Sequence, residues 1–153
     1  MSYHAEVTSM PVEERLGSYI KRAEQALMGA KNAALKPTGV TIPQYAALYV
    51  LSENPGISAA ELARRCGVTP PTMNTVLTNL RDRGLIERTP HAWHRNVLET
   101  SLTDEGRKVM RAADKRAVPV ERALAAEFTE AESAALIAML ERAATVLDAV
   151  RPD

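Results

Sequence analysis

The segment "SAAELARRCGVTPPTMNTVLTNLRDRGL", residues 58–85, holds two helix starts only eleven residues apart. Each start has a hydroxyl residue that can cap a helix, Ser58 for the first and Thr69 for the second. Between them lies Gly67, a residue that readily adopts the left-handed backbone of a helix end, so the first helix is expected to stop after barely two turns. Two short helices joined by a tight glycine turn are typical of a helix-turn-helix.

The segments on either side of this pair are also predicted to be helical. Capping boxes, in which a hydroxyl residue and a Gln or Glu three positions later cap each other's backbone N–H groups, occur at three places: Thr41 with Gln44, Ser58 with Glu61, and Thr129 with Glu132. Apolar residues at alternating steps of three and four predict long helices over residues 12–35, from Thr103 onward and over residues 129–150. Pro119 is expected to kink or break the second of these long helices.

After Gly84 the spacing of apolar residues changes from helical to extended. Residues 85–89 and 98–102 are predicted to be strands, and the polar residues 90–96 between them form the loop of a hairpin. A helix-turn-helix followed by such a hairpin is a winged helix-turn-helix. The predicted fold is one domain, mainly α-helical with a small β-hairpin wing, in which a winged helix-turn-helix lobe over residues 41–103 is flanked by helices over residues 10–36 and 104–150.

Composition limits the class of protein. The 153 residues suit one domain, and an aromatic content of only 4% favours helices over a β-sandwich. No apolar run approaches the ~18 residues of a membrane span, and the first six residues do not resemble a signal peptide. Because Cys66 is the only cysteine, no internal disulfide can form, and a reducing cytoplasm is the expected compartment.

Charge is unevenly distributed along the chain. The net charge is zero, but residues 58–95 contain six arginines and three acidic residues, which gives this segment +3 and leaves −3 for the remainder. A basic segment in a neutral chain indicates either contact with nucleic acid or a solvated surface of mixed charge.

The second short helix has a polar face that suits DNA. In a helix-turn-helix this helix lies in the major groove, while the first helix braces it across the DNA backbone. Thr and Asn have no helix-forming advantage on a merely exposed surface, so a face rich in them favours contact with base edges and phosphates. The candidate DNA-binding residues are Thr69, Pro71, Thr72, Asn74, Thr75, Thr78 and Asn79, together with Arg64 on the first helix and His94 and Arg95 in the wing.

The order and spacing of these motifs resemble the MarR family of bacterial transcriptional regulators, from the first helix to the sixth. The recognition helix of that family ends in Leu-x-x-x-Gly-Leu-Ile, here Leu80, Gly84, Leu85 and Ile86, and the wing ends in Leu-Thr-x-x-Gly, here Leu102, Thr103 and Gly106. The resemblance implies a homodimer held by the first, fifth and sixth helices. It also implies a repressor that binds a pseudo-palindromic operator in double-stranded DNA and is released by a small-molecule effector.

The chain departs from the family's pattern at positions that would contact DNA. The wing reads His94-Arg95-Asn96 where the family usually has Asp-Arg-Arg, so only Arg95 inherits the role of the wing arginine. Thr75, Thr78 and Asn79 stand where the family usually has an Arg and then an Asp-Arg pair. Fewer cations at the phosphates predict a shallow dependence of DNA binding on salt.

The resemblance also suggests where an effector binds. Small aromatic or phenolic effectors of the family often occupy a cleft between the dimerisation helices and the DNA-binding lobe. Tyr19, Tyr45 and Tyr49 are candidates to line that cleft, and the alternative is that they are ordinary core residues.

Other residues leave alternatives open. Cys66 is either a buried structural thiol or an oxidation sensor, and Trp93 either packs the wing against the lobe or stacks near DNA. His91 and His94 are expected to be neutral and free of metal, with protonation of the wing as a second hypothesis. No cofactor is expected, and no nucleophile–base pair or phosphate-binding glycine loop indicates an enzyme. The alternative function is a winged-helix protein-interaction module without specific DNA binding.

Overall fold

A computed structural model describes residues 10–94 and 98–152. The described chain is mainly helical and carries one antiparallel hairpin, which confirms the predicted fold class. The helices are α1 (Leu16–Leu35), α2 (Ile42–Glu53), α3 (Ala59–Cys66), α4 (Pro70–Asp82), α5 (Asp104–Ala126) and α6 (Glu130–Ala149), the strands are β1 (Ile86–Pro90) and β2 (Leu98–Leu102), and short 3₁₀ turns cover Val12–Glu14 and Lys36–Thr38.

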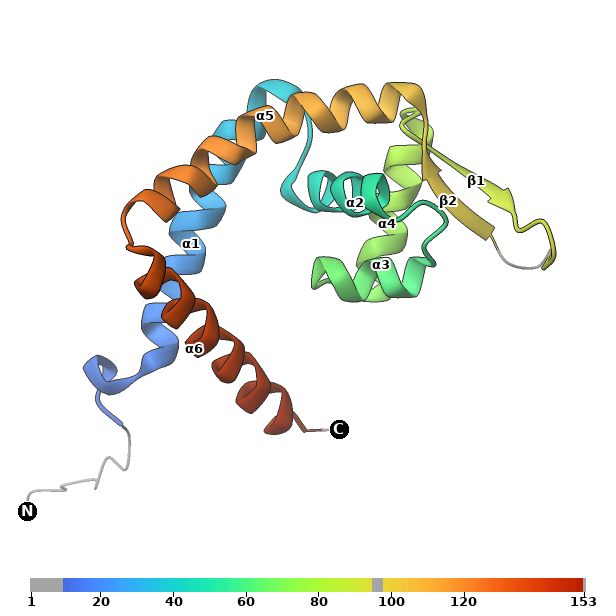
Figure 1. Ribbon diagram of the computed structural model, residues 1–153. Helices are drawn as coiled ribbons and strands as arrows, with labels where there is room; N and C mark the ends of the chain where they lie inside the picture. Colours follow the sequence, from blue (N-terminus) through green and yellow to red (C-terminus); the bar gives the residue numbers. More distant parts are fainter. Residues whose placement is uncertain (1–9, 95–97, 153) are drawn as a thin grey trace, which may run out of the picture.

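The long helix α5 connects the two parts of the molecule (Figure 1). One end of α5 packs on α2 and β2, and its other part packs along α1. The helices α2, α3 and α4 and the hairpin gather beneath the first end, while α6 extends away from the second. The part of the chain that the structure describes has no helix long and apolar enough to cross a membrane.

The core of the molecule lies inside the winged-helix lobe. Leu48, Leu62, Met73 and Leu80 are completely buried there. They come from α2, α3 and α4, whose apolar faces meet one another and the hairpin. A second, much smaller cluster of Leu35, Ala113 and Ala117 joins α1 to α5.

The predicted helix starts are present, with one correction. Thr41 with Gln44 and Thr129 with Glu132 form complete capping boxes, and hydrogen bonds from Thr129 lower the pKa of Glu132. The Ser58 hydroxyl accepts from the Glu61 backbone N–H, but the capping box predicted there is wrong. The Glu61 carboxylate turns instead toward Arg64 and Arg65, because two charged partners hold a carboxylate more strongly than one backbone N–H.

Two predicted boundaries differ from the structure, and one of the two outcomes predicted at Pro119 is rejected. The first long helix begins at Leu16 rather than Val12, because the extended backbone of Arg15 separates it from the preceding 3₁₀ turn. The strand β1 begins one residue late, because the Leu85 N–H donates to the Leu80 carbonyl and ends α4 instead. Pro119 does not break α5, which continues as one helix to Ala126 and arches over the lobe in Figure 1.

Candidate nucleic-acid interface

The helix α4 has two distinct faces. Met73, Val76, Leu77 and Leu80 are buried in the lobe and fix the orientation of the helix. The opposite face is exposed and consists of short polar side chains: Thr72, Asn74, Thr75, Thr78 and Asn79. A hollow along this face is lined by the last four of these residues and Asp82. The structure therefore brings together five of the candidate DNA-binding residues on one solvent-facing surface.

The turn before α4 determines where this helix begins. Gly67 adopts the left-handed conformation with φ of 66°, and its N–H donates to the Arg64 carbonyl, which ends α3. Thr69 then caps α4: its hydroxyl accepts from the Thr72 backbone N–H over 3.3 Å and donates to the Thr72 hydroxyl over 3.0 Å. Pro71 is exposed in the first helical turn, where a missing N–H breaks no helical hydrogen bond. Thr69 and Pro71 thus lie at the end of α4 that a helix-turn-helix points toward base edges.

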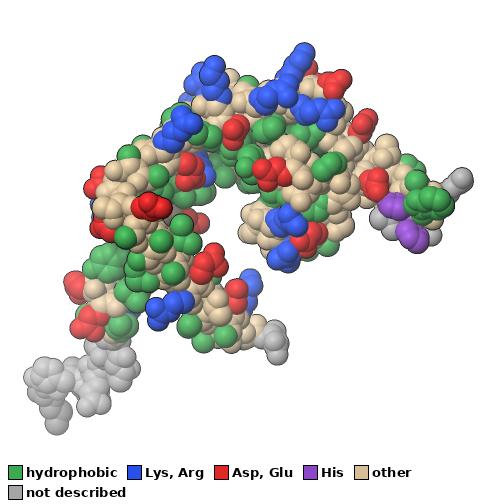
Figure 2. All heavy atoms as spheres, in the orientation of Figure 1, with side chains coloured by type: hydrophobic (Ala, Val, Ile, Leu, Met, Phe, Trp, Pro, Cys, Tyr) green, Lys and Arg blue, Asp and Glu red, His purple; other side chains and the backbone are tan. Residues whose placement is uncertain are grey.

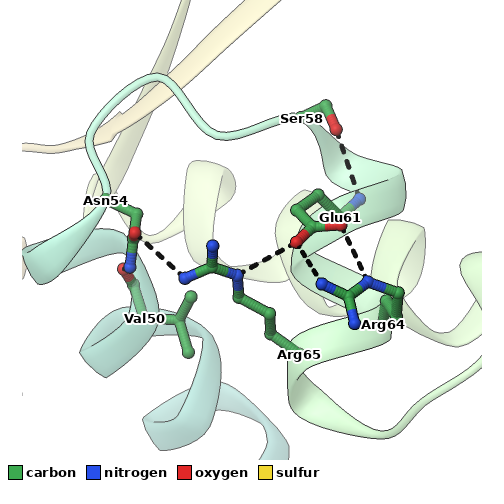
Figure 3. A network of polar contacts seen from close by, with 6 residues as sticks. All are labelled: Val50, Asn54, Ser58, Glu61, Arg64 and Arg65. Carbon is green, nitrogen blue, oxygen red and sulfur yellow. Dashed lines mark hydrogen bonds and ion pairs between the residues drawn. The ribbon is translucent and has the colours of Figure 1, made fainter.

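Most arginines of the basic segment already have partners within the lobe. Figure 3 shows Arg64 and Arg65 converging on Glu61, with Arg65 Nη1 also donating to Asn54 Oδ1 over 3.0 Å. Hydrogen bonds from both guanidinium groups lower the pKa of Glu61 to about 2, and the same contact raises the pKa of Arg64. Arg83 and Arg88 donate to Gly39 and Thr100. The positive charge that α3 and α4 present is therefore smaller than a count of arginines suggests.

The wing carries exposed aromatic and imidazole groups. His91 Nδ1 accepts from the backbone N–H groups of Trp93 and His94, over 3.0 and 3.2 Å, and its Nε2 lies 3.3 Å from a Glu99 carboxylate oxygen. Trp93 is 86% exposed, so it does not pack the wing against the lobe. His94 is also exposed, close to His91 (Figure 2). Arg95, the predicted wing arginine, lies outside the described residues.

The three candidate effector-binding tyrosines are not assembled within one chain. Tyr45 and Tyr49 are neighbours on α2, with ring centroids 6.2 Å apart. Tyr45 is half-buried against Leu35 at the end of α1 and donates its hydroxyl to Asp114 on α5 over 2.6 Å. Burial and this hydrogen bond raise the pKa of Tyr45. Tyr19 lies four turns earlier on α1, about 24 Å along the helix axis from Leu35, and donates to the Glu13 carbonyl.

A hollow between the lobe and α5 was not anticipated from the sequence. It has a volume of about 350 Å³ and is lined by residues of α2, β2 and α5 that include Leu51, Met110, Arg107 and Arg111. Small-molecule sites typically combine such an apolar wall with a few charged groups, in volumes of roughly 300–1,000 Å³. The signal in the sequence was the pair of arginines four residues apart, which places both on the Met110 side of one helix.

Cys66 is half-buried at the end of α3, and burial raises the pKa of its thiol. A raised pKa lowers the thiolate fraction, and the thiolate is the form that reacts with oxidants. Of the two interpretations, the surroundings of Cys66 support the structural thiol.

Comparison with known proteins gives the family. The sequence model of the MarR family matches residues 38–95, from the turn before α2 to the wing. The HTH-type transcriptional repressor Rv2887 of Mycobacterium tuberculosis is 42% identical over 108 residues, which cover 66% of this chain and 78% of that protein. The chain therefore belongs to the MarR family, whose members are transcriptional regulators and not enzymes.

Two solved structures extend the comparison from sequence to fold. The Mycobacterium tuberculosis protein Rv2887 in complex with p-aminosalicylic acid has a TM-score of 0.66 and 35% identity, and the match covers 85% of this chain and 98% of that one. The transcriptional repressor CouR, bound to a 23-mer DNA duplex, has a TM-score of 0.78 and 28% identity over 90% of this chain and 99% of that one. Both matches extend well beyond the winged-helix lobe and include the long helices.

Proposed function

We propose that this regulator is a homodimeric repressor that places α4 in the major groove of a pseudo-palindromic operator. In this proposal residues 41–103 form the DNA-binding lobe, and residues 10–36 and 104–150 form the dimerisation helices. The observation that carries the proposal is the division of α4 into a fully buried apolar face and an exposed face of hydroxyl and amide groups. The similarity to CouR, a transcriptional repressor that was solved bound to a DNA duplex, supports DNA binding by this chain.

The proposal of a dimer rests on apolar side chains that one chain leaves uncovered. Among the described residues α6 has no buried side chain, although its apolar positions recur at helical spacing. Figure 2 shows hydrophobic side chains gathered over α6 and the elements beside it. The exposed large apolar residues of this end of the molecule are Met10, Val12, Leu16, Tyr19, Ile20, Leu124, Ile137, Met139, Leu140, Val146, Leu147 and Val150.

We propose that a second copy of the chain buries this apolar surface. Contiguous apolar patches of this kind on a soluble protein mark an interface, and a two-fold axis lets the same patch serve both partners. Two lobes related by that axis would present two copies of α4 about one helical turn of DNA apart, and such an arrangement reads a pseudo-palindrome.

The proposed effector is a small aromatic carboxylate. The relative Rv2887 was solved with p-aminosalicylic acid, which has this chemistry. In this chain the hollow beside Leu51 and Met110 offers an apolar wall and the guanidinium group of Arg111, with Arg107 beside it in an ion pair with Asp104. A ligand wedged in this hollow between the lobe and α5 would favour a dimer in which the two copies of α4 no longer match the operator.

The test is binding of the purified protein to DNA from upstream of its own gene, by gel shift at 50 and 200 mM salt. Thr75→Glu places a negative charge in the middle of the exposed α4 face and is expected to abolish the shift. Ala138→Glu adds the same charge to α6, on the side away from its apolar stripe, and is the matched control. Absence of a shift for the unmodified protein at 50 mM salt would favour the protein-interaction module instead.

A further inference from the structure

A chain of hydrogen bonds joins the start of α2 to the exposed face of α4. The Thr41 backbone N–H donates to Gln44 Oε1 over 3.1 Å, and Gln44 Nε2 donates to Asn79 Oδ1 over 2.9 Å. Arg83 Nη1 also donates to Gln44 Oε1, over 3.4 Å. The half-buried side chain of Gln44 therefore lies between the cap of α2 and a residue of the candidate DNA-binding face.

The donors at the start of this hydrogen-bond series determine which atom donates and which accepts in every later bond. A backbone N–H and a guanidinium can only donate, so the Gln44 atom that faces both of them has to be the carbonyl oxygen. The Gln44 amide nitrogen is then the atom turned toward Asn79. Because an amide nitrogen can only donate, Asn79 has to accept with Oδ1.

This arrangement decides which end of the Asn79 amide is available to a ligand. Oδ1 is engaged by Gln44, whereas the Nδ2 group donates to no other residue that the structure describes. Asn79 is exposed, so its two N–H groups remain for the solvent-facing surface of α4. An unrestrained asparagine could present an oxygen and a nitrogen together, the pattern that matches adenine.

Resting on the proposed role of α4 in DNA binding, we infer that Gln44 is a specificity-determining positioning residue. It holds Asn79 so that α4 presents N–H donors to a hydrogen-bond acceptor of the operator. In the major groove guanine offers two such acceptors, N7 and O6, whereas cytosine offers a donor, N4. A phosphate oxygen offers the same acceptor chemistry without reading sequence.

The substitution Gln44→Glu inverts the polarity without changing the length of the side chain. The carboxylate can still accept from the Thr41 N–H and can pair with Arg83, so the cap of α2 is preserved. It has no donor for Asn79, whose amide then turns its nitrogen toward the new carboxylate and its oxygen toward DNA. An acceptor of the operator would face an oxygen in place of an N–H.

The experiment uses duplexes that the unmodified protein selects from a random-sequence pool. Binding constants of the protein, Gln44→Glu, Asn79→Ala and the double variant are measured by fluorescence anisotropy, after thermal unfolding has shown that each variant is folded. The added negative charge weakens binding equally with and without Asn79, so the double-mutant cycle removes it. We expect Gln44→Glu to weaken binding about tenfold more when Asn79 is present than when it is replaced by alanine.

The same cycle with Asn74→Ala is the matched control, because Asn74 is an exposed asparagine of the same helix five residues earlier. Its cycle is expected to be additive. If Asn79 reads a base, Gln44→Glu also changes the preferred base at one operator position from guanine toward cytosine or adenine; if it meets a phosphate, the loss is the same on every sequence.

The inference is overturned if Gln44→Glu weakens binding by the same factor in both backgrounds, which would make the Gln44–Asn79 contact only a link between α2 and α4. A protein that selects no duplex from the pool would instead refute the proposed function. Asn79→Asp is a second variant that keeps the contact with Gln44 but presents an oxygen to DNA. It is expected to bind at least as weakly as Asn79→Ala, and stronger binding would also overturn the inference.

Discussion

The winged-helix lobe and the helix α6 are built from similar residues but differ in how those residues are covered. In the lobe, Leu48 and Leu80 are completely buried, because α2, α3, α4 and the hairpin cross one another and close a core. In α6, Leu140 and Leu147 remain about half exposed, because no second element of the described chain covers them. A stripe of apolar residues therefore predicts that a helix face is buried. The three-dimensional arrangement decides whether the same chain or another one covers that face.

The largest effect is expected from charging the uncovered face. The double variant Leu140→Glu/Leu147→Glu should convert the proposed dimer to a monomer, since four carboxylates would have to be buried without partners in the interface. Light scattering over a range of protein concentrations measures the mass directly. Ala138→Glu, on the other side of α6, is expected to remain dimeric; a double variant with unchanged mass would show that α6 is not in the interface.

The closed lobe can be disrupted by a single methyl group. Gly106 is buried in the first turn of α5, and a Cβ there would overlap the carbonyl oxygen of Leu85. We expect Gly106→Ala to lower the free energy of unfolding by about 3 kcal/mol, measured by urea denaturation.

A matched glycine in α1 should respond in the opposite direction. Gly29 lies inside α1, and a Cβ there would meet nothing within 4 Å in one chain. Gly29→Ala should therefore stabilise the protein by about 1 kcal/mol through helix propensity. Destabilisation of that variant would indicate that a partner chain packs closely against this position.

The junction between the lobe and the long helix α5 contains one charged hydrogen bond. The Tyr45 hydroxyl on α2 donates to Asp114 on α5, and Tyr45→Phe leaves that half-buried carboxylate without its donor. The expected loss in free energy of unfolding is about 1.5–3 kcal/mol. Tyr49→Phe, at an exposed position on the same helix, should change stability by less than about 0.5 kcal/mol. Equal losses for the two variants would contradict a specific role for Tyr45.

The smallest effect is a change in acid stability. The pKa of Glu61 is about 2 in the folded protein, below its ordinary value of 4.5, because Arg64 and Arg65 donate to the carboxylate. The resulting stabilisation is fully present above about pH 4.5 and is lost as the pH falls toward 2. Glu61→Gln should flatten this part of the profile of urea midpoint against pH. Glu24→Gln, at an exposed position on α1, serves as the control. A profile that Glu61→Gln leaves unchanged would show that the exposed pairs contribute nothing measurable.

Local patterns predicted most of the secondary structure because they act within a few residues. The caps at Thr41, Thr69 and Thr129 and the left-handed turn at Gly67 follow from side chains and backbone that meet within one turn of helix. The capping box predicted at Ser58 failed because competing partners existed. The Glu61 carboxylate could accept hydrogen bonds either from a backbone N–H or from two arginines, and the sequence alone did not show which contacts would form.

The candidate DNA-binding face of α4 was predictable because it also depends only on residues close together in the sequence. Once Met73, Val76, Leu77 and Leu80 are assigned to the core, helical geometry sends Thr75 and Thr78 to the other side. The hollow beside Arg107 and Arg111 was not predictable, because its walls come from three elements whose packing the sequence does not specify.

By itself the sequence determined the helices, the hairpin and the polar face of α4, since caps, glycine turns and apolar spacing are properties of neighbouring residues. Tertiary structure alone decided how the polar groups are paired. It brought Arg65 to Asn54, joined Tyr45 to Asp114 and turned the nitrogen of Asn79 outward through Gln44. Hydrogen bonds and ion pairs have a range of only a few ångströms and a fixed direction, so they depend on which distant segments the fold brings into contact.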